Sequence, residues 1–460
     1  RAERKCTLVF TGDGATSEGD FHESVNTAAV WDLPVIIVIE NNGYGLSTPS
    51  SEQFRCKLLS DKAIGYGIEH RVVAGNNILD VVHSLREVAA DIRQRPRPVL
   101  VECMTFRMRG HEEASGTKYV PQELFTEWEK KDPVVNYERW LVGTGILTEA
   151  AKEVMRKRIK AEIAEAVEVA FSEPAITPSV EAELNDVYSR PVILSRGRSS
   201  APEAPPQGPE KRFIEAISEG MRESMQRFPQ LVLMGQDIAE YGGAFKVTDG
   251  FVPAFGKERV RNTPLCESAI LGAGLGLSIN GMKAMVEMQF ADFVSEGMTQ
   301  ICNNLAKAHW RWGQNADVVV RMPTGAGSGA GPFHSQSNEA WFVKTPGLKV
   351  VYPAFPADAK GLLCAAFEDP DPVIYFEHKN LYRSLTGPVP EGWYTTPIGE
   401  AALVRTGPEL TVVTYGMGVH WAMAELDKQG IRADLIDLRT LLPWDQERVL
   451  ESVKRTGRAL

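Results

Sequence analysis

The chain has 460 residues, of which 43% are hydrophobic and 24% are charged, as expected of a globular protein long enough for two or three domains. Its formal net charge of −10, with no basic cluster evident, argues against nucleic acid as a partner, because phosphate binding requires clustered lysine and arginine. No apolar run approaches the length of a membrane span. The six cysteines lie far apart without metal-ligand spacing, so we expect buried thiols in a reducing compartment.

Residues 7–49 predict two strands joined by a helix. The apolar runs 8–10 and 35–39 are the predicted strands, and residues 18–30 are a predicted helix whose N-terminus faces an anion. Because the carboxyl ends of neighbouring parallel strands meet at one edge of a sheet, the polar residues that follow the two strands should lie together. These residues are Gly12, Asp13 and Gly14 after the first strand, and Asn41, Asn42 and Tyr44 after the second.

This set of groups has the chemistry of a magnesium site. A carboxylate from Asp13, an amide oxygen from Asn42 and the Tyr44 carbonyl suit a Mg²⁺ ion that also holds water and phosphate oxygens. A Gly-Asp-Gly sequence by itself is more often an ordinary turn, but the Asn-Asn pair about thirty residues later favours the metal. The pattern therefore predicts a site for a magnesium diphosphate.

The spacing of these motifs resembles that of thiamine diphosphate enzymes. The surrounding residues resemble the α subunit of the decarboxylating component of 2-oxoacid dehydrogenase complexes. The resemblance implies thiamine diphosphate and Mg²⁺ as cofactors. It implies that the cofactor-binding residues of this region are Gly12, Asp13, Gly14, Ala15 and Asn42, and that the metal ligands are Asp13, Asn42 and Tyr44.

The rest of the first half predicts a strand at 98–103, a loop that contains His111, and a solvated amphipathic helix at 149–171. Residues 191–209 are rich in Pro, Ser and Gly and form a predicted linker. The resemblance makes residues 1–190 an α-type diphosphate-binding domain.

A second α/β unit begins near Glu210. A glycine-rich stretch at 325–331 is expected to give backbone freedom to the loop that carries His334. Beyond residue 398 we expect only two strand–helix pairs, which is little sheet for a settled domain. For that reason, and because the chain begins on the first strand of its own motif, we expect both ends to be truncated. The strands predicted in the second unit are 231–234, 283–288, 318–321 and 350–352.

The second half resembles the β subunit of the same dehydrogenase component, over residues 261–293, 331–363, 369–383 and 435–445. The implied fold class is α/β, with two thiamine-diphosphate-binding, doubly wound parallel-sheet domains and a truncated transketolase C-terminal-like α/β domain. The implied second and third domains are a β-type pyrimidine-binding domain at 210–390 and the C-terminal-like domain at 391–460.

The resemblance implies three catalytic residues, Glu267, His111 and His334. Glu267 would face the aminopyrimidine ring and share a proton with a ring nitrogen; a helix-capping glutamate is the alternative. The two histidines would stabilise the substrate carboxylate and carry protons, although a loop histidine can also simply satisfy a turn. Phe290 would pack against the pyrimidine, where an aromatic residue is otherwise ordinary core.

The implied reaction is oxidative decarboxylation of a small 2-oxoacid, with acyl transfer to the lipoyl-lysine of a partner dihydrolipoyl acyltransferase. The loop and the β-type half are closest to the branched-chain (2-oxoisovalerate) type, which favours 3-methyl-2-oxobutanoate. Pyruvate or acetoin is the second candidate, and transketolase-type ketol transfer, which needs extra basic residues, is a third. A subunit that binds without turnover is the non-enzymatic alternative.

Two positions depart from the family pattern. Phe293 stands where branched-chain relatives carry a tyrosine, which removes a hydroxyl from the pocket. Glu112 stands where mitochondrial relatives carry a phosphorylatable serine. We therefore expect a bacterial cytoplasmic enzyme without kinase control, a homodimer equivalent to two α and two β subunits, and no membrane or nucleic-acid partner.

Overall fold

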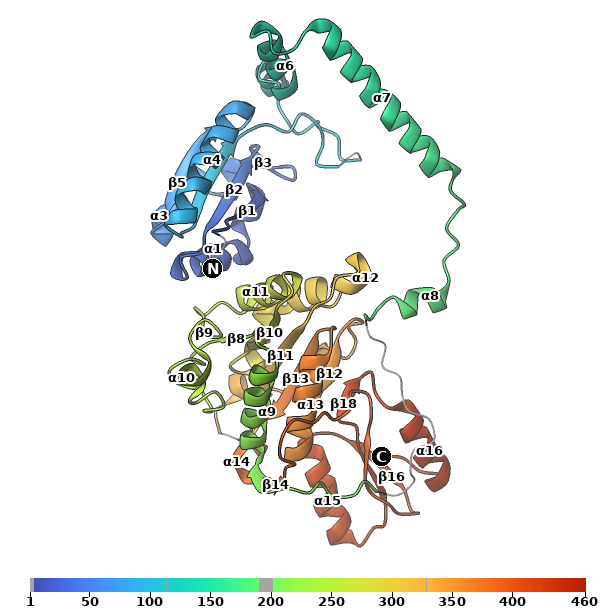
Figure 1. The fold of residues 1–460 in the computed structure, drawn as a ribbon. Coiled ribbons are helices and arrows are strands. Elements are labelled where there is room, and N and C mark those ends of the chain that lie inside the picture. The colour runs from blue at the N-terminus through green and yellow to red at the C-terminus, as the bar shows by residue number, and fades with distance from the viewer. Residues whose placement is uncertain (1–3, 113, 190–201, 328) are drawn as a thin grey trace. The chain divides into compact units, whose positions relative to one another are not determined.

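The computed structural model describes residues 4–112, 114–189, 202–327 and 329–460 (Figure 1). These residues form two compact units, which divide between Thr177 and Pro178. The predicted linker at 191–209 lies largely outside the described residues, and residues 202–209 contain no helix or strand. The domain boundaries expected from the sequence stay a prediction.

The first unit is built on a four-stranded parallel sheet with the order β1-β2-β6-β5. Ile36 and Val38 of β2 enter a core with α4. Ile37 and Ile39 point to the other face, into a core with α1. A parallel strand covered on both faces reads as one apolar run, which is why this strand is predictable. The elements are β1 (Thr7–Gly12), α1 (Gly19–Val30), β2 (Val35–Asn41), α3 (Lys62–Tyr66), β5 (Glu69–Ala74), α4 (Ile78–Gln94) and β6 (Val99–Met104).

Two short strands and four further α-helices, outside the four-stranded sheet, also belong to the described part of this unit. The helix predicted at 149–171 is confirmed as α7, and none of its residues is buried. Its exposure agrees with the expected solvated helix. The short elements and the remaining helices are β3 (Tyr44–Gly45), β4 (Thr48–Pro49), α2 (Ser50–Gln53), α5 (Gln122–Glu129), α6 (Pro133–Gly143) and α7 (Glu149–Ser172).

The second unit contains a seven-stranded sheet with the order β18-β12-β13-β11-β10-β8-β9, parallel except for the β12–β18 pair. Helices α9 and α13 pack against each other and share one core with the sheet (Figure 1). The strands are β8 (Leu231–Gly235), β9 (Val260–Asn262), β10 (Lys283–Glu287), β11 (Val318–Thr324), β12 (Lys349–Val351), β13 (Val373–His378) and β18 (Thr440–Leu442). The main helices are α9 (Phe213–Arg227), α11 (Glu267–Ile279) and α13 (Pro356–Glu368).

The C-terminal section has more sheet than the two predicted strands. A third strand, β15, pairs antiparallel with β17 and extends the sheet to the order β15-β17-β16. Helix α15 shares a core with this sheet. The elements are β15 (Ala402–Arg405), β16 (Thr411–Thr414), α15 (Met417–Gln429), β17 (Asp434–Asp437) and α16 (Gln446–Thr456).

The predicted α/β class is thus confirmed, with two sheets built from parallel strands and a smaller α/β section after them. Within the described ranges, no helix combines the length and the apolar character that a bilayer crossing requires.

Candidate functional site

The Gly-Asp-Gly turn lies at the carboxyl end of β1, as predicted. Gly12 is in register with Glu40 of β2, so both strands end at the same edge of the sheet. Asp13 is only 2% exposed. Its Oδ1 accepts a hydrogen bond of 2.9 Å from the Gly14 N–H, and its main-chain carbonyl accepts one of 2.7 Å from the Thr16 hydroxyl. These bonds fix the carboxylate at the start of the turn.

The Asn-Asn pair forms a second turn at the end of β2. The Gly43 N–H donates to Asn41 Oδ1, and the Tyr44 N–H donates to Asn42 Oδ1, each over 3.2 Å. Asn41 also donates from Nδ2 to Glu102 Oε1 at 2.7 Å. Glu102 is completely buried in β6, and its other oxygen accepts the Ser60 N–H at 2.8 Å. The sequence analysis did not identify Glu102, although a glutamate inside an apolar strand was a signal.

The two turns lie against each other. A Cβ atom placed on Gly14 would stand 2.8 Å from the Gly45 Cα, so only glycine permits this approach. The Ser50 hydroxyl donates to Asp13 Oδ2 at 3.5 Å, which ties the first turn to the segment after the second. The oxygen donors and the close backbone approach fit a hard divalent cation that carries a diphosphate.

The His111 loop is connected to the same region through Arg107. The Arg107 guanidinium lies 3.4 Å from His111 Nδ1 and donates to the Leu46 carbonyl at 2.5 Å. It also donates to the Tyr119 hydroxyl at 3.0 Å, and the Tyr119 ring lies 5.8 Å from that of Tyr44. His111 itself is exposed. Arg107 therefore holds the histidine loop beside the second turn.

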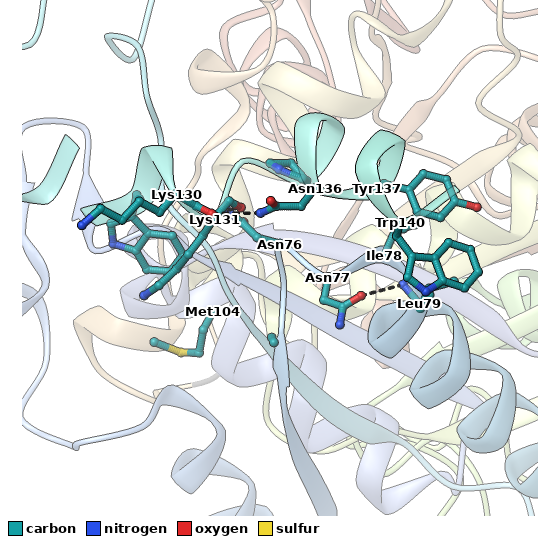
Figure 2. Close-up of a pocket in the computed structure, with 13 residues that line it drawn as sticks. Asn76, Asn77, Ile78, Leu79, Met104, Lys130, Lys131, Asn136, Tyr137 and Trp140 are labelled. Atoms are coloured by element: carbon teal, nitrogen blue, oxygen red, sulfur yellow. Dashed lines mark hydrogen bonds between the residues drawn. The ribbon is translucent and has the colours of Figure 1, made fainter. Parts of the chain in front are cut away.

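Two cavities border this part of the first unit. One, of about 330 Å³, is lined by residues that include Asn42 and Tyr44. The other, of about 620 Å³, lies at the start of α4 and is shown in Figure 2. The two share Met104 and Trp128 in their linings, but the larger one contains no predicted site residue.

In the second unit, Glu267 is the first residue of α11. Its Oε1 accepts a hydrogen bond of 3.0 Å from Gln236 Nε2. Gln236 is buried and directly follows β8, so it holds the half-buried carboxylate at the carboxyl edge of the sheet. Gln236 was not predicted, although a polar residue just after an apolar strand is the same signal that singled out Asp13.

Phe290 and His334 are brought together in the second unit. Their rings meet edge to face at 4.7 Å, and Phe293 also contacts His334 at 5.4 Å. The histidine loop is anchored by Gln336, whose N–H donates to Asp292 Oδ1 at 3.0 Å.

The glycine-rich stretch before His334 has the backbone freedom expected of it. Its four described glycines all have positive φ, a conformation that favours glycine. They are Gly325, Gly327, Gly329 and Gly331.

A buried charge cluster joins three neighbouring strands of the second unit. Arg321 of β11 is 1% exposed and forms ion pairs with Glu287 of β10 and Glu377 of β13. Tyr382 donates to Glu377 Oε2 at 2.5 Å. Burial raises the pKa of Glu287 to about 7, against the opposing effect of Arg321. The sequence analysis did not identify this cluster.

Comparison with known families accounts for most of the chain. The model described as "Dehydrogenase E1 component" matches residues 1–179. The model of the transketolase pyrimidine-binding domain matches residues 210–384, and that of the transketolase C-terminal domain matches residues 399–460.

Individual relatives are similar to about half of the chain. The β subunit of 2-oxoisovalerate dehydrogenase from Bacillus subtilis is 46% identical over 253 residues, which are 54% of this chain and 77% of that subunit. The β subunit of the pyruvate dehydrogenase E1 component from the same organism is 40% identical over 54% of this chain and 78% of its own length. The β subunit of acetoin:2,6-dichlorophenolindophenol oxidoreductase from Cupriavidus necator is 45% identical over 53% of this chain and 76% of its own length.

Proposed function

The chain belongs to the family of decarboxylating E1 components of 2-oxoacid dehydrogenases, with an α-type and a β-type part in one polypeptide, and we propose that its substrate is a branched-chain 2-oxoacid. The preferred substrate is 3-methyl-2-oxobutanoate. Enzymes of this family work with lipoyl acyltransferase partners, and the acyl group passes to the lipoyl-lysine of that partner.

The observation that carries the proposal is the contact between the two turns of the first unit. Gly14 approaches Gly45 closely beside the buried Asp13 carboxylate. In this family such an edge binds thiamine diphosphate. Asp13, Asn42 and the Tyr44 carbonyl would hold the accompanying Mg²⁺, with the diphosphate against Gly12, Gly14 and Ala15.

When bound, thiamine diphosphate supplies the electron sink for loss of CO₂. The residues of the chain supply position and proton transfer. Glu267 holds a proton at its carboxyl group for exchange with a ring nitrogen, and Gln236 fixes that carboxyl group. Phe290 offers a flat apolar surface, and His334 and His111 carry protons at their ring nitrogens.

The choice of substrate class rests on similarity and on the pocket rings. Identity is higher to the 2-oxoisovalerate subunit (46%) than to the pyruvate subunit (40%) from the same organism. The rings of Phe290 and Phe293 offer an apolar surface to an alkyl group, although Phe293 departs from the tyrosine of branched-chain relatives. Acetoin is the second candidate, because the acetoin-enzyme subunit is 45% identical.

We further propose a homodimer equivalent to two α and two β subunits. We also propose a bacterial cytoplasmic location, in keeping with six cysteines that form no disulfide bond among the described residues.

The test is CO₂ release by the full-length protein with thiamine diphosphate, Mg²⁺ and an artificial electron acceptor. Branched-chain 2-oxoacids, pyruvate and acetoin are compared as substrates. We expect the highest kcat/KM for 3-methyl-2-oxobutanoate, and a loss of at least about 100-fold in Glu267→Gln. Preference for pyruvate or acetoin overturns the substrate assignment, and thiamine-dependent ketol transfer without CO₂ release overturns the reaction. Light scattering on the same sample tests the dimer.

A further inference from the structure

Lys379 directly follows β13 and lies at the carboxyl end of the sheet in the second unit. Its main-chain N–H donates to the Thr324 carbonyl of β11 at 3.0 Å, so the residue is anchored between two strand ends. The side chain is only 6% exposed. Among the residues that the structure describes, Nζ has no hydrogen-bond partner. Ligands of open α/β sheets bind at this end of the strands.

The nearest feature around Nζ is an aromatic ring of the predicted site. Nζ lies 5.5 Å from the centre of the Phe290 ring, which in turn contacts His334 at 4.7 Å. A cation–π contact of this kind stabilises a buried lysine only weakly. Removing an ammonium group from water costs more than the ring returns, so the ring alone does not compensate for the burial.

Neighbouring charges do not neutralise Lys379 by direct contact. Asp292 attracts it electrostatically, but neither Lys379 Nζ nor Asp292 Oδ2 has a hydrogen-bond partner among the described residues. Glu377, two residues earlier, is bound to Arg321 and Tyr382.

The protonation states favour a single positive charge at this position. Burial lowers the pKa of Lys379 to about 8, so the ammonium form prevails at neutral pH. Burial also lowers the pKa of the adjacent His378 to about 4, so that ring is neutral. A buried monocation with free hydrogen-bonding capacity therefore lies over the Phe290 ring.

We propose that Lys379 binds the carboxylate of the 2-oxoacid substrate. The ligand class is a small monocarboxylate, because one ammonium group matches one negative charge and the rings of Phe290 and Phe293 accept a short alkyl group. This inference rests on the proposed function, and it names the residue that separates charged 2-oxoacids from neutral carbonyl compounds.

The test compares Lys379→Gln, which removes the charge, with Lys379→Arg, which keeps it. Lys428→Gln, at an exposed lysine of the second unit, is the matched control. With 3-methyl-2-oxobutanoate we expect KM to rise at least about 10-fold in Lys379→Gln while kcat changes less than about 3-fold, and Lys379→Arg to recover most of the loss.

Two inhibitors distinguish a binding role from a structural one. 3-Methylbutanoate keeps the carboxylate of the substrate and lacks its keto group. 3-Methylbutan-2-one keeps the keto group and has a methyl group in place of the carboxylate. Only the inhibition constant of the carboxylate should rise in Lys379→Gln. Equal changes for both inhibitors, or an unchanged KM, would overturn the inference.

The affinity of the cofactor-loaded protein for 3-methylbutanoate, measured by calorimetry, tests the role of Lys379 independently of turnover. A wild-type protein that releases no CO₂ from any 2-oxoacid refutes the proposed function. Even then, tighter carboxylate binding by the wild type than by Lys379→Gln supports the inference, and equal binding refutes it. Thermal unfolding serves as the folding check, and loss of a buried unpaired charge should leave the melting temperature unchanged or higher.

Discussion

At the scale of single residues, Gly14 sets how closely the two turns of the first unit can approach. In Gly14→Ala, the new Cβ would meet the Gly45 Cα at 2.8 Å, and main-chain atoms yield only by moving the turns. We expect a loss of about 1–3 kcal/mol in the free energy of unfolding and weaker thiamine diphosphate binding. Differential scanning calorimetry with and without cofactor measures both.

Gly19→Ala is the control for this substitution. Gly19 begins α1, and a Cβ there meets nothing within 4 Å, so alanine should be neutral or slightly stabilising. Equal destabilisation by the two variants would refute the role assigned to Gly14.

A buried carboxyl group makes stability depend on pH. Asp437 is completely buried, and burial raises its pKa to about 7, with the charge of Asp358 adding to the effect. The unfolded chain has a pKa near 4 at this residue, so the folded state binds the proton more tightly. The contribution of Asp437 to the free energy of unfolding is therefore at its full value below about pH 4, and it is lost as the pH rises to about 7 and above.

Asp437→Asn should remove this loss. Compared with the wild type, the variant should gain up to about 3–4 kcal/mol at pH 8 and little at pH 4.5, as urea denaturation midpoints would show. Asp427→Asn is the control, since Arg405 lowers the pKa of that exposed carboxylate and the gain at high pH should be absent. A gain that is equal at both pH values would contradict the assignment.

At the scale of elements, Arg321 ties β10, β11 and β13 together at the end that carries the site. Arg321→Met leaves Glu287 and Glu377 buried without their cation. Loss of one partner of a buried charge cluster costs about 3–5 kcal/mol, and we expect a loss of that size in chemical denaturation. Arg227→Met, which breaks a more exposed pair with Glu368, should cost less than about 1 kcal/mol. Similar losses in both variants would disprove the cluster's role.

The elements also show what the sequence could and could not predict. Strands 35–39 and 231–234 were predictable because strands covered on both faces are continuous apolar runs. Strand β18 was not, because its three residues become a strand by pairing with β12, far away in the sequence. Local pattern carries no information about such a partner.

The residues of the candidate site also include some that the sequence could predict and some that it could not. Asp13 and Asn42 belong to a motif with a fixed spacing, so sequence alone singled them out. Gln236 and Lys379 are polar residues at strand ends whose roles depend on burial and on distant neighbours. Only the packed structure shows that Gln236 bonds Glu267 and that Lys379 Nζ has no hydrogen-bond partner among the described residues.

At the scale of the whole molecule, each of the two units has its own sheet and core. We expect cleavage at a protease site inserted between Thr177 and Pro178, in an exposed segment without helix or strand, to leave the circular dichroism spectrum and the thermal transitions unchanged. The same site inserted at Gly430, between α15 and β17, should destabilise the second unit, because the sheet there pairs β16 with β17. Unfolding after cleavage between Thr177 and Pro178 would show that the two units depend on a continuous chain.

The place of β18 affects any attempt to recombine this chain with its relatives. In sequence, Thr440–Leu442 belongs to the C-terminal section, but in space it forms the edge of the large sheet beside Val350 and Val351. A hybrid that takes residues 391–460 from another parent thus also imports a foreign edge strand. Side chains that β12 and β18 present to each other must therefore be inherited from the same parent, wherever the junction is made.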